Sequence, residues 1–92
     1  MVIFMTWKDF DSLIRAAIPD EEVAQNMDIM PYTRLIEDLE YDSFAVVELL
    51  SLMEEHYGID YTELPNFEER FGACRDLYDG MRELIAVHTG EV

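Results

Sequence analysis

One stretch of the sequence, residues 43–57, constrains the fold more than any other. Its fifteen residues contain neither proline nor glycine, begin with a serine and run directly into Gly58, a residue type that often ends a helix. Asp42 or Ser43 can cap this helix, because either side-chain oxygen can accept an unpaired backbone N–H of the first turn. At about 100° per residue one face is apolar, and we expect it to form core through Val46, Leu49, Leu50, Met53 and Tyr57.

The opposite face of the same helix has an unusual composition. A solvated face would normally be polar throughout, but here a phenylalanine and a valine lie among three carboxylates. Apolar side chains surrounded by charge are typical of a surface that binds another protein. We therefore predict a partner-binding surface made of Phe44, Val47, Glu48, Ser51, Glu54 and Glu55.

The residues around the start of this helix resemble those of a known family, the acyl carrier proteins. Their signature Asp-Leu-Gly-x-Asp-Ser-Leu is similar to Asp38-Leu39-Glu40-Tyr41-Asp42-Ser43-Phe44, and the acidic helix that follows is similar as far as Tyr57-Gly58-Ile59. The resemblance is most specific from Thr33 to Ile59. Two positions depart from the signature: Glu40 replaces a glycine, which puts the backbone turn of the loop in question, and Phe44 replaces a leucine.

The resemblance implies a covalent cofactor and a set of partner enzymes. In this family a phosphopantetheinyl transferase attaches 4′-phosphopantetheine from coenzyme A to the serine that corresponds to Ser43, directly after the aspartate that corresponds to Asp42. The terminal thiol of the arm then holds acyl groups as thioesters. Acyltransferases, ketosynthases and other biosynthetic enzymes with basic docking patches would contact Glu48, Glu54 and Glu55, while Phe44 and Val47 supply the apolar centre of the contact.

The charge of the chain excludes some classes of partner. There are 21 acidic residues against six Lys and Arg, which gives a formal charge of −15. Such a surface repels nucleic acid phosphates and anionic lipid head groups and attracts proteins with basic patches. We expect no nucleic-acid partner, no membrane anchor and a monomer. The single cysteine, Cys74, cannot form an internal disulfide and suits a reducing cytoplasm.

Helical patterns dominate the rest of the chain, and residues 1–92 are expected to form one all-α domain. The spacing predicts a first helix over Thr6–Ile18 with a Thr6/Asp9 capping box, a short helix over Asn66–Arg70 capped by Asn66, and a last helix over Ala73–Val87. The connection 19–42 is long, so we expect it to be ordered, with a helical turn at 20–25 and anchors at Leu35 or Ile36, Leu39, Met27, Ile29 and Met30. These elements predict a small four-helix bundle of three main helices and one short helix, with a long ordered loop between the first two.

The sequence offers little for catalysis or metal binding. Ser43 lacks a Gly-x-Ser-x-Gly elbow, and His56 lies about 20 Å along the same helix at ~1.5 Å per residue. His88 is expected to be solvated. A calcium loop beginning at Asp38 fails, because Ser43 and Leu49 occupy its glycine and final carboxylate positions. We expect no metal site and no enzymatic activity of the isolated chain.

Three hypotheses for function follow from these observations. The first is a discrete acyl carrier protein of polyketide or fatty-acid-type biosynthesis. The second is an aminoacyl or peptidyl carrier of nonribosomal peptide assembly, which would share the serine-linked arm but carry amino acids. The third, of a different class, is an acidic adapter protein that binds other proteins and carries no arm.

Overall fold

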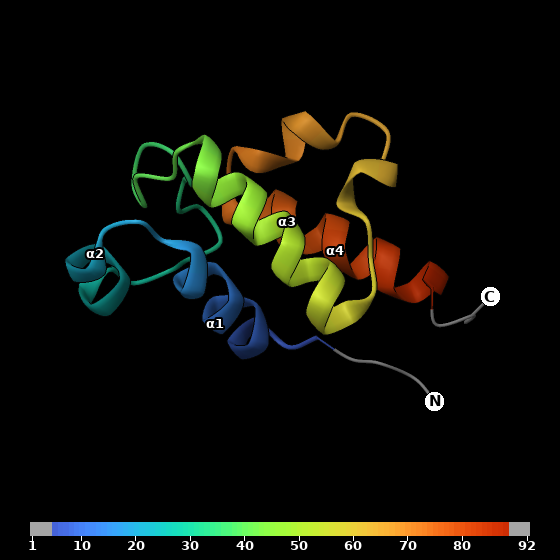
Figure 1. Ribbon diagram of the computed structural model, residues 1–92, viewed down its shortest axis with the longest axis horizontal. Helices are drawn as coiled ribbons and strands as arrows, with labels where there is room; N and C mark the ends of the chain where they lie inside the picture. Colours follow the sequence, from blue (N-terminus) through green and yellow to red (C-terminus); the bar gives the residue numbers. More distant parts are fainter. Residues whose placement is uncertain (1–4, 89–92) are drawn as a thin grey trace.

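The chain is all-α in the computed structural model, which describes residues 5–88 (Figure 1). The structure has four α-helices: α1 (Trp7–Ala17), α2 (Glu21–Asn26), α3 (Ser43–Tyr57) and α4 (Cys74–His88). Two short 3₁₀ helices, η1 (Tyr61–Glu63) and η2 (Phe67–Phe71), lie between α3 and α4. No strand occurs within residues 5–88, where a single isolated bridge pairs Arg34 with Ala73. Helix α1 packs against α3, and η2 packs against α4.

Helix α1 begins with the predicted capping box. The Asp9 N–H donates to Thr6 Oγ1 at 3.2 Å, and the Thr6 N–H donates to Asp9 Oδ2 at 3.0 Å. The hydrogen bond that the Thr6 N–H donates to the Asp9 carboxylate, and a smaller contribution from the Thr6 side chain, lower the pKa of the Asp9 carboxyl because they favour its charged form. The predicted end residues, Thr6 and Ile18, are the two caps of the helix.

Helix α3 has the predicted bounds, and Gly58 ends it with a left-handed φ of 66°. Its buried stripe is rotated from the one we predicted. Leu49 and Met53 are fully buried together with Ala45, which the sequence reading had not assigned to the core. Val46, Leu50 and Tyr57 are half-buried at the edges of this stripe. Ala45 lies on the same side of the helix as Leu49 and Met53, because the three are spaced four residues apart.

The connection between α1 and α3 is ordered and contains the short helix α2, capped by Asp20. Ile29, Leu35 and Leu39 are buried as predicted, and Met27 is half-buried. Of the alternatives Leu35 and Ile36, Leu35 is the anchor and Ile36 is 63% exposed, whereas the predicted anchor at Met30 is wrong, because its side chain is 42% exposed. They point outward because hydrogen bonds of the loop backbone to the start of α4, not these side chains, hold the loop in place.

The segment after α3 departs further from the prediction. The expected loop includes η1, and the expected helix at Asn66–Arg70 is the 3₁₀ helix η2. Asn66 does not cap it with its side chain, because its own backbone is left-handed at φ 59°. The short helix of the predicted bundle is therefore α2, not the 66–70 segment.

Helix α4 begins and ends one residue later than predicted, and its buried residues include Leu77, Met81, Leu84 and Ile85. Gly80 lies on the same buried side, where the Tyr61 ring crosses the helix and its hydroxyl donates to the Leu77 carbonyl at 3.2 Å. A Cβ at Gly80 would lie 2.9 Å from Leu64 Cδ1 and closer still to the Tyr61 hydroxyl oxygen. Glycine is required here for close packing, although it costs up to about 1 kcal/mol in a helix.

We expect Gly80→Ala to lower the free energy of unfolding by about 1–3 kcal/mol, because the added methyl group overpacks this contact. Urea unfolding measures the change. Asp79→Ala, at an exposed neighbour in the same helix, is the control and should have little effect. The double variant Tyr61→Phe/Gly80→Ala should lose less free energy of unfolding than the two single variants lose together, because the hydroxyl that the added methyl group would meet is gone. A stabilised Gly80→Ala would contradict this packing.

Candidate functional site

Asp42 and Ser43 form the start of α3. Asp42 is the N-cap, and its Oδ1 accepts the Ala45 N–H at 2.8 Å, while its backbone carbonyl accepts the Val46 N–H at 3.1 Å. Ser43 is the first residue of the helix and is exposed. Because Asp42 supplies the cap, the Ser43 hydroxyl is not needed for it, and no residue of the described chain hydrogen-bonds to this hydroxyl.

The backbone around Ser43 has free hydrogen-bond donors. The N–H groups of Ser43 and Phe44 come before the first intrahelical bond, and within residues 5–88 neither has a partner. These donors and the positive end of the helix dipole favour a negative group at this position. The site can therefore accept a phosphate ester on the serine oxygen without losing an existing bond.

Tyr41 holds this end of α3 against α1, a role that the sequence reading missed. Its hydroxyl donates to the Ile14 carbonyl at 2.8 Å, and the side chain is only 3% exposed. The carbonyl is available because Ile18 N–H bonds to Arg15 O, which leaves Ile14 without its usual helical donor. Burial raises the pKa of the Tyr41 hydroxyl well above its ordinary value, so it stays a donor at all physiological pH. Nothing in the sequence pointed to this contact, because Tyr41 occupies the variable position of the Asp-Leu-Gly-x-Asp-Ser-Leu signature.

The loop before Tyr41 makes a left-handed turn at Glu40, where φ is 58°. This is the position at which the acyl carrier signature has glycine. Leu35 and Leu39, which both precede Glu40, are fully buried, and the Tyr41 N–H after it donates to the Leu35 carbonyl at 3.0 Å. The turn thus forms without glycine, held by the two leucines and at the cost of a strained backbone at Glu40.

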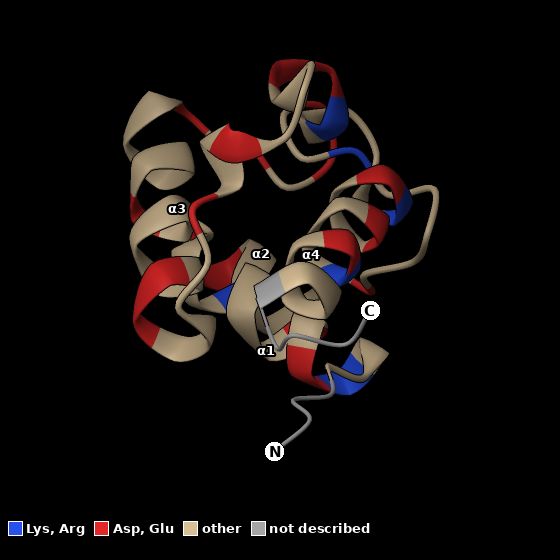
Figure 2. Cartoon of the chain, turned by 90° about the vertical axis from the view of Figure 1, so that its right-hand side faces the viewer, with Lys and Arg blue, Asp and Glu red and all other residues tan. Residues whose placement is uncertain are grey.

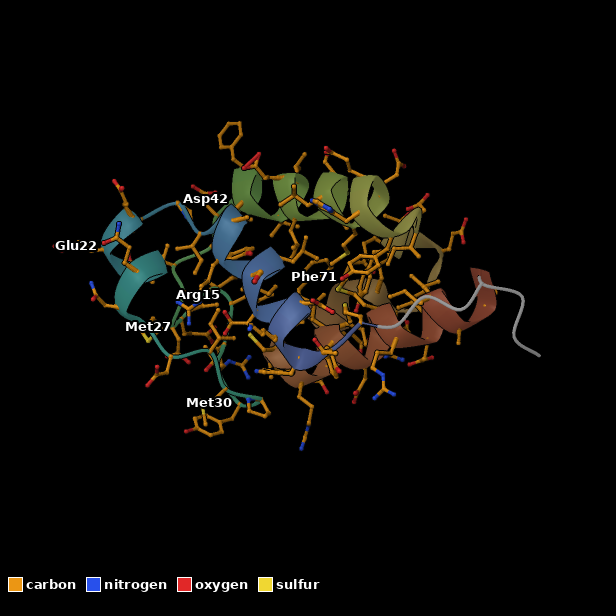
Figure 3. The ribbon with its side chains drawn as sticks, turned by 90° about the horizontal axis from the view of Figure 1, so that it is seen from below. Arg15, Glu22, Met27, Met30, Asp42 and Phe71 are labelled. Carbon is orange, nitrogen blue, oxygen red and sulfur yellow. The ribbon has the colours of Figure 1, made fainter. Side chains whose placement is uncertain are left out.

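All of the predicted partner-binding residues lie on the outward face of α3. Phe44 is 84% exposed and Val47 61% exposed, and the four polar members are exposed as well. Their roles as partner contacts stay predictions. In Figure 3 the side chains of α3 project from its outer side, next to the labelled Asp42.

This face is also one wall of a groove, which the sequence did not predict. The groove runs between α3 and the end of α1 and has a volume of about 540 Å³. Three of its lining residues, Ala17, Ile18 and Ala45, are buried, and the others are exposed. The lining residues are Ala16, Ala17, Ile18, Pro19, Asp42, Phe44, Ala45, Val47, Glu48 and Ser51.

Helix α3 itself has acidic residues and no lysine or arginine. Between Arg34 and Arg70 the sequence has no lysine or arginine, although it has eleven aspartates and glutamates. In Figure 2 the charged residues of α3 are all acidic, and the basic residues lie on other parts of the chain. Three of the arginines are already paired, Arg15 with Asp11, Arg34 with Glu37 and Arg70 with Glu83. A basic surface of another molecule would therefore be drawn to α3.

The remaining candidates for chemistry are not assembled into a second site. Among residues 5–88 no group of three or more His, Cys, Asp or Glu is placed to hold a metal ion. His56 is exposed near the far end of α3, and the His88 side chain lies outside the described residues. No described helix has both the length and the apolar character that crossing a membrane requires.

Comparisons of the chain with protein families, with curated proteins and with solved structures found no match. The resemblance to acyl carrier proteins therefore rests on the sequence itself, chiefly on the residues from Thr33 to Ile59 and more weakly on those from there to Leu84.

We expect Glu40→Gly to raise the free energy of unfolding by about 1 kcal/mol relative to Glu40→Ala, because glycine adopts a left-handed backbone without strain. Both variants remove the same charge, so their difference isolates the backbone. Asn66→Gly should raise the free energy of unfolding by less, because asparagine tolerates the left-handed backbone that it adopts here. Equal stability of the two Glu40 variants in urea unfolding would show that the turn is not strained.

Cys74 is fully buried, and burial, with a smaller effect of the carboxylates of Asp38 and Asp11, raises the pKa of its thiol to about 12. We expect the folded chain to be unreactive toward a disulfide reagent at neutral pH, where the thiolate is scarce and inaccessible. Unfolding in urea should release one reactive thiol. Ser12→Cys adds an exposed thiol as the control and should react at once. Rapid reaction of native Cys74 would overturn its assignment to the core.

Proposed function

We propose that this chain is a discrete acyl carrier protein that carries acyl intermediates on a 4′-phosphopantetheine arm attached to Ser43. The observation that carries the proposal is the exposed Ser43 hydroxyl, which has no hydrogen-bond partner in the described chain and opens a 15-residue helix capped by the preceding aspartate. A small four-helix bundle with a long ordered loop, as in that family, and a cytoplasmic location are parts of the same proposal.

The residues at this site fit the proposed group. The serine side chain is exposed, and the N–H groups of Ser43 and Phe44, without partners in the described chain, can donate to a phosphodiester. The carboxylate next to the serine, Asp42, uses its Oδ1 to accept the Ala45 N–H and cap the helix, so we assign removal of the serine proton to a base of the transferase. When attached, the arm provides a terminal thiol that holds the acyl group as a thioester. The chain needs such a thiol, because its own Cys74 is buried.

The outer face of α3 would serve the partner enzymes. Phe44 and Val47 supply apolar area, and Glu48, Glu54 and Glu55 meet basic side chains of the phosphopantetheinyl transferase, acyltransferase or ketosynthase. Each exposed ion pair contributes only about 0.2–1 kcal/mol, so the contacts are weak and salt-sensitive. Weak contacts allow a carrier to leave one enzyme for the next. Polyketide or fatty-acid-type biosynthesis is the proposed setting.

Two other functions remain as competing outcomes. An aminoacyl or peptidyl carrier would use the same serine and arm, and loading by an adenylating enzyme instead of a malonyl or acyl transferase would identify it. An acidic adapter would use the outer face of α3 without an arm. The exposed, unbonded serine favours a carrier over the adapter, because an adapter has no use for it.

We expect the chain, incubated with coenzyme A and a broad-specificity phosphopantetheinyl transferase, to gain the mass of one phosphopantetheine group. Intact mass spectrometry measures the gain. Ser43→Ala should stay unmodified, whereas Ser12→Ala, at an exposed serine of α1 outside the predicted partner-binding surface, should be modified fully. Circular dichroism must show that both variants are folded. An unmodified wild type would support the adapter, and modification of Ser43→Ala would exclude Ser43 as the attachment residue.

A further inference from the structure

The loop between α2 and α3 displays apolar side chains that the core does not use. Tyr32 is 74% exposed, and Met30 and Ile36 are also exposed. In Figure 3 Met30 and Asp42 lie on opposite sides of the chain, so this surface is separate from the start of α3. Exposed apolar residues that a structure holds in place are typical of binding surfaces.

The loop is held rigidly at this point. Thr33 is buried, and its Oγ1 accepts the Met30 N–H at 2.8 Å, while its N–H donates to the Met30 carbonyl at 3.0 Å. The start of α4 fixes the loop from the other side, because the Cys74 N–H donates to Thr33 O and the Arg75 N–H donates to Pro31 O, both at 2.8 Å. The outward residues are therefore preorganised, and a ligand would not have to order them.

Beside Tyr32 is a hollow of about 360 Å³, distinct from the groove between α1 and α3. It combines apolar walls, an aromatic side chain and two carboxylates, and no lysine or arginine lines it. Its lining residues are Met27, Asp28, Met30, Tyr32, Thr33 and Asp38. Asp38 Oδ2 accepts the Arg34 N–H at 2.8 Å, whereas the Asp28 carboxylate has no partner within residues 5–88.

This combination matches one kind of occupant. A long cationic side chain has an apolar stem that packs on methionine, and a charged end that pairs with carboxylates and lies against an aromatic ring. Arginine fits better than lysine, because its planar guanidinium can stack on tyrosine and bind a carboxylate through two N–H groups. The net charge of −15 also favours a basic partner.

We propose that the hollow formed by Met27, Asp28, Met30, Tyr32 and Asp38 binds an arginine side chain displayed on a partner protein. It is a second interaction surface, and it does not depend on the proposed arm at Ser43. A protein bound here leaves the outer face of α3 open to another partner.

The probe is a short capped peptide with one arginine between two leucines, titrated into the ¹⁵N-labelled chain at low salt. The matched control peptide has citrulline in place of arginine, which keeps the shape and removes the charge. We expect amide shifts concentrated at residues 27–38, with binding about tenfold weaker for the citrulline peptide, the loss that one charged hydrogen-bonded contact implies. Added salt should weaken the arginine peptide more than the control.

Variants separate this surface from the one on α3. Asp28→Asn/Tyr32→Ser changes two exposed side chains and should abolish the shifts, with an unchanged urea midpoint as the test of folding. Phe44→Ser should bind the peptide like the wild type. The proposal is overturned if no localised shift occurs at millimolar peptide, if the shifts map to α3, if citrulline binds equally, or if the double variant still binds. It is also overturned if sedimentation shows a dimer that Tyr32→Ser disrupts, because the occupant would then be a second copy.

Discussion

The arrangement of this chain depends on how the start of α3 is fixed against the end of α1. The Tyr41 hydroxyl supplies the donor that the Ile14 carbonyl lacks, and it does so from a fully packed position. A buried hydrogen bond of this kind is costly to leave unmade, because both groups would be desolvated without a partner. Directly after Tyr41, Asp42 caps the helix, and Leu49 and Met53 bury its inner side. With the helix held at these points, Ser43 and Phe44 have no structural task and face solvent.

How much could be predicted from the sequence differs between elements for physical reasons. Capping residues and helical spacing are local signals, so the ends of α1 and α3 were predicted within one residue. The exposure of Met30 and the hydrogen bond of Tyr41 could not be predicted, because they depend on which distant carbonyl or helix end lies nearby in the fold. The groove beside α3 could not be predicted for the same reason, since four of its ten lining residues, Ala16 to Pro19, come from the end of α1 and the two residues after it. At Asn66 the backbone adopted a conformation that makes a side-chain cap impossible.

Two departures from the acyl carrier signature have different physical consequences. At Glu40 the backbone keeps the left-handed turn that glycine would make easily, so the substitution affects stability and not the course of the chain. At Phe44 an exposed aromatic ring stands in place of leucine and changes the shape of the surface beside the serine. The first departure concerns the folding of this chain alone. The second concerns the partners that it can bind, and we infer that they differ from those of a chain with leucine.

The central proposal is that Ser43 carries a covalent 4′-phosphopantetheine arm. The most direct measurement is mass spectrometry of the protein isolated from its native cells, with fragmentation of the tryptic peptide that spans residues 35–70. Of the two serines in this peptide, we predict that fragmentation places phosphopantetheine, free or loaded with an acyl group, on Ser43 and not on Ser51. Isolated protein in which this peptide has only its unmodified mass, from cells that contain an active phosphopantetheinyl transferase, would contradict the account.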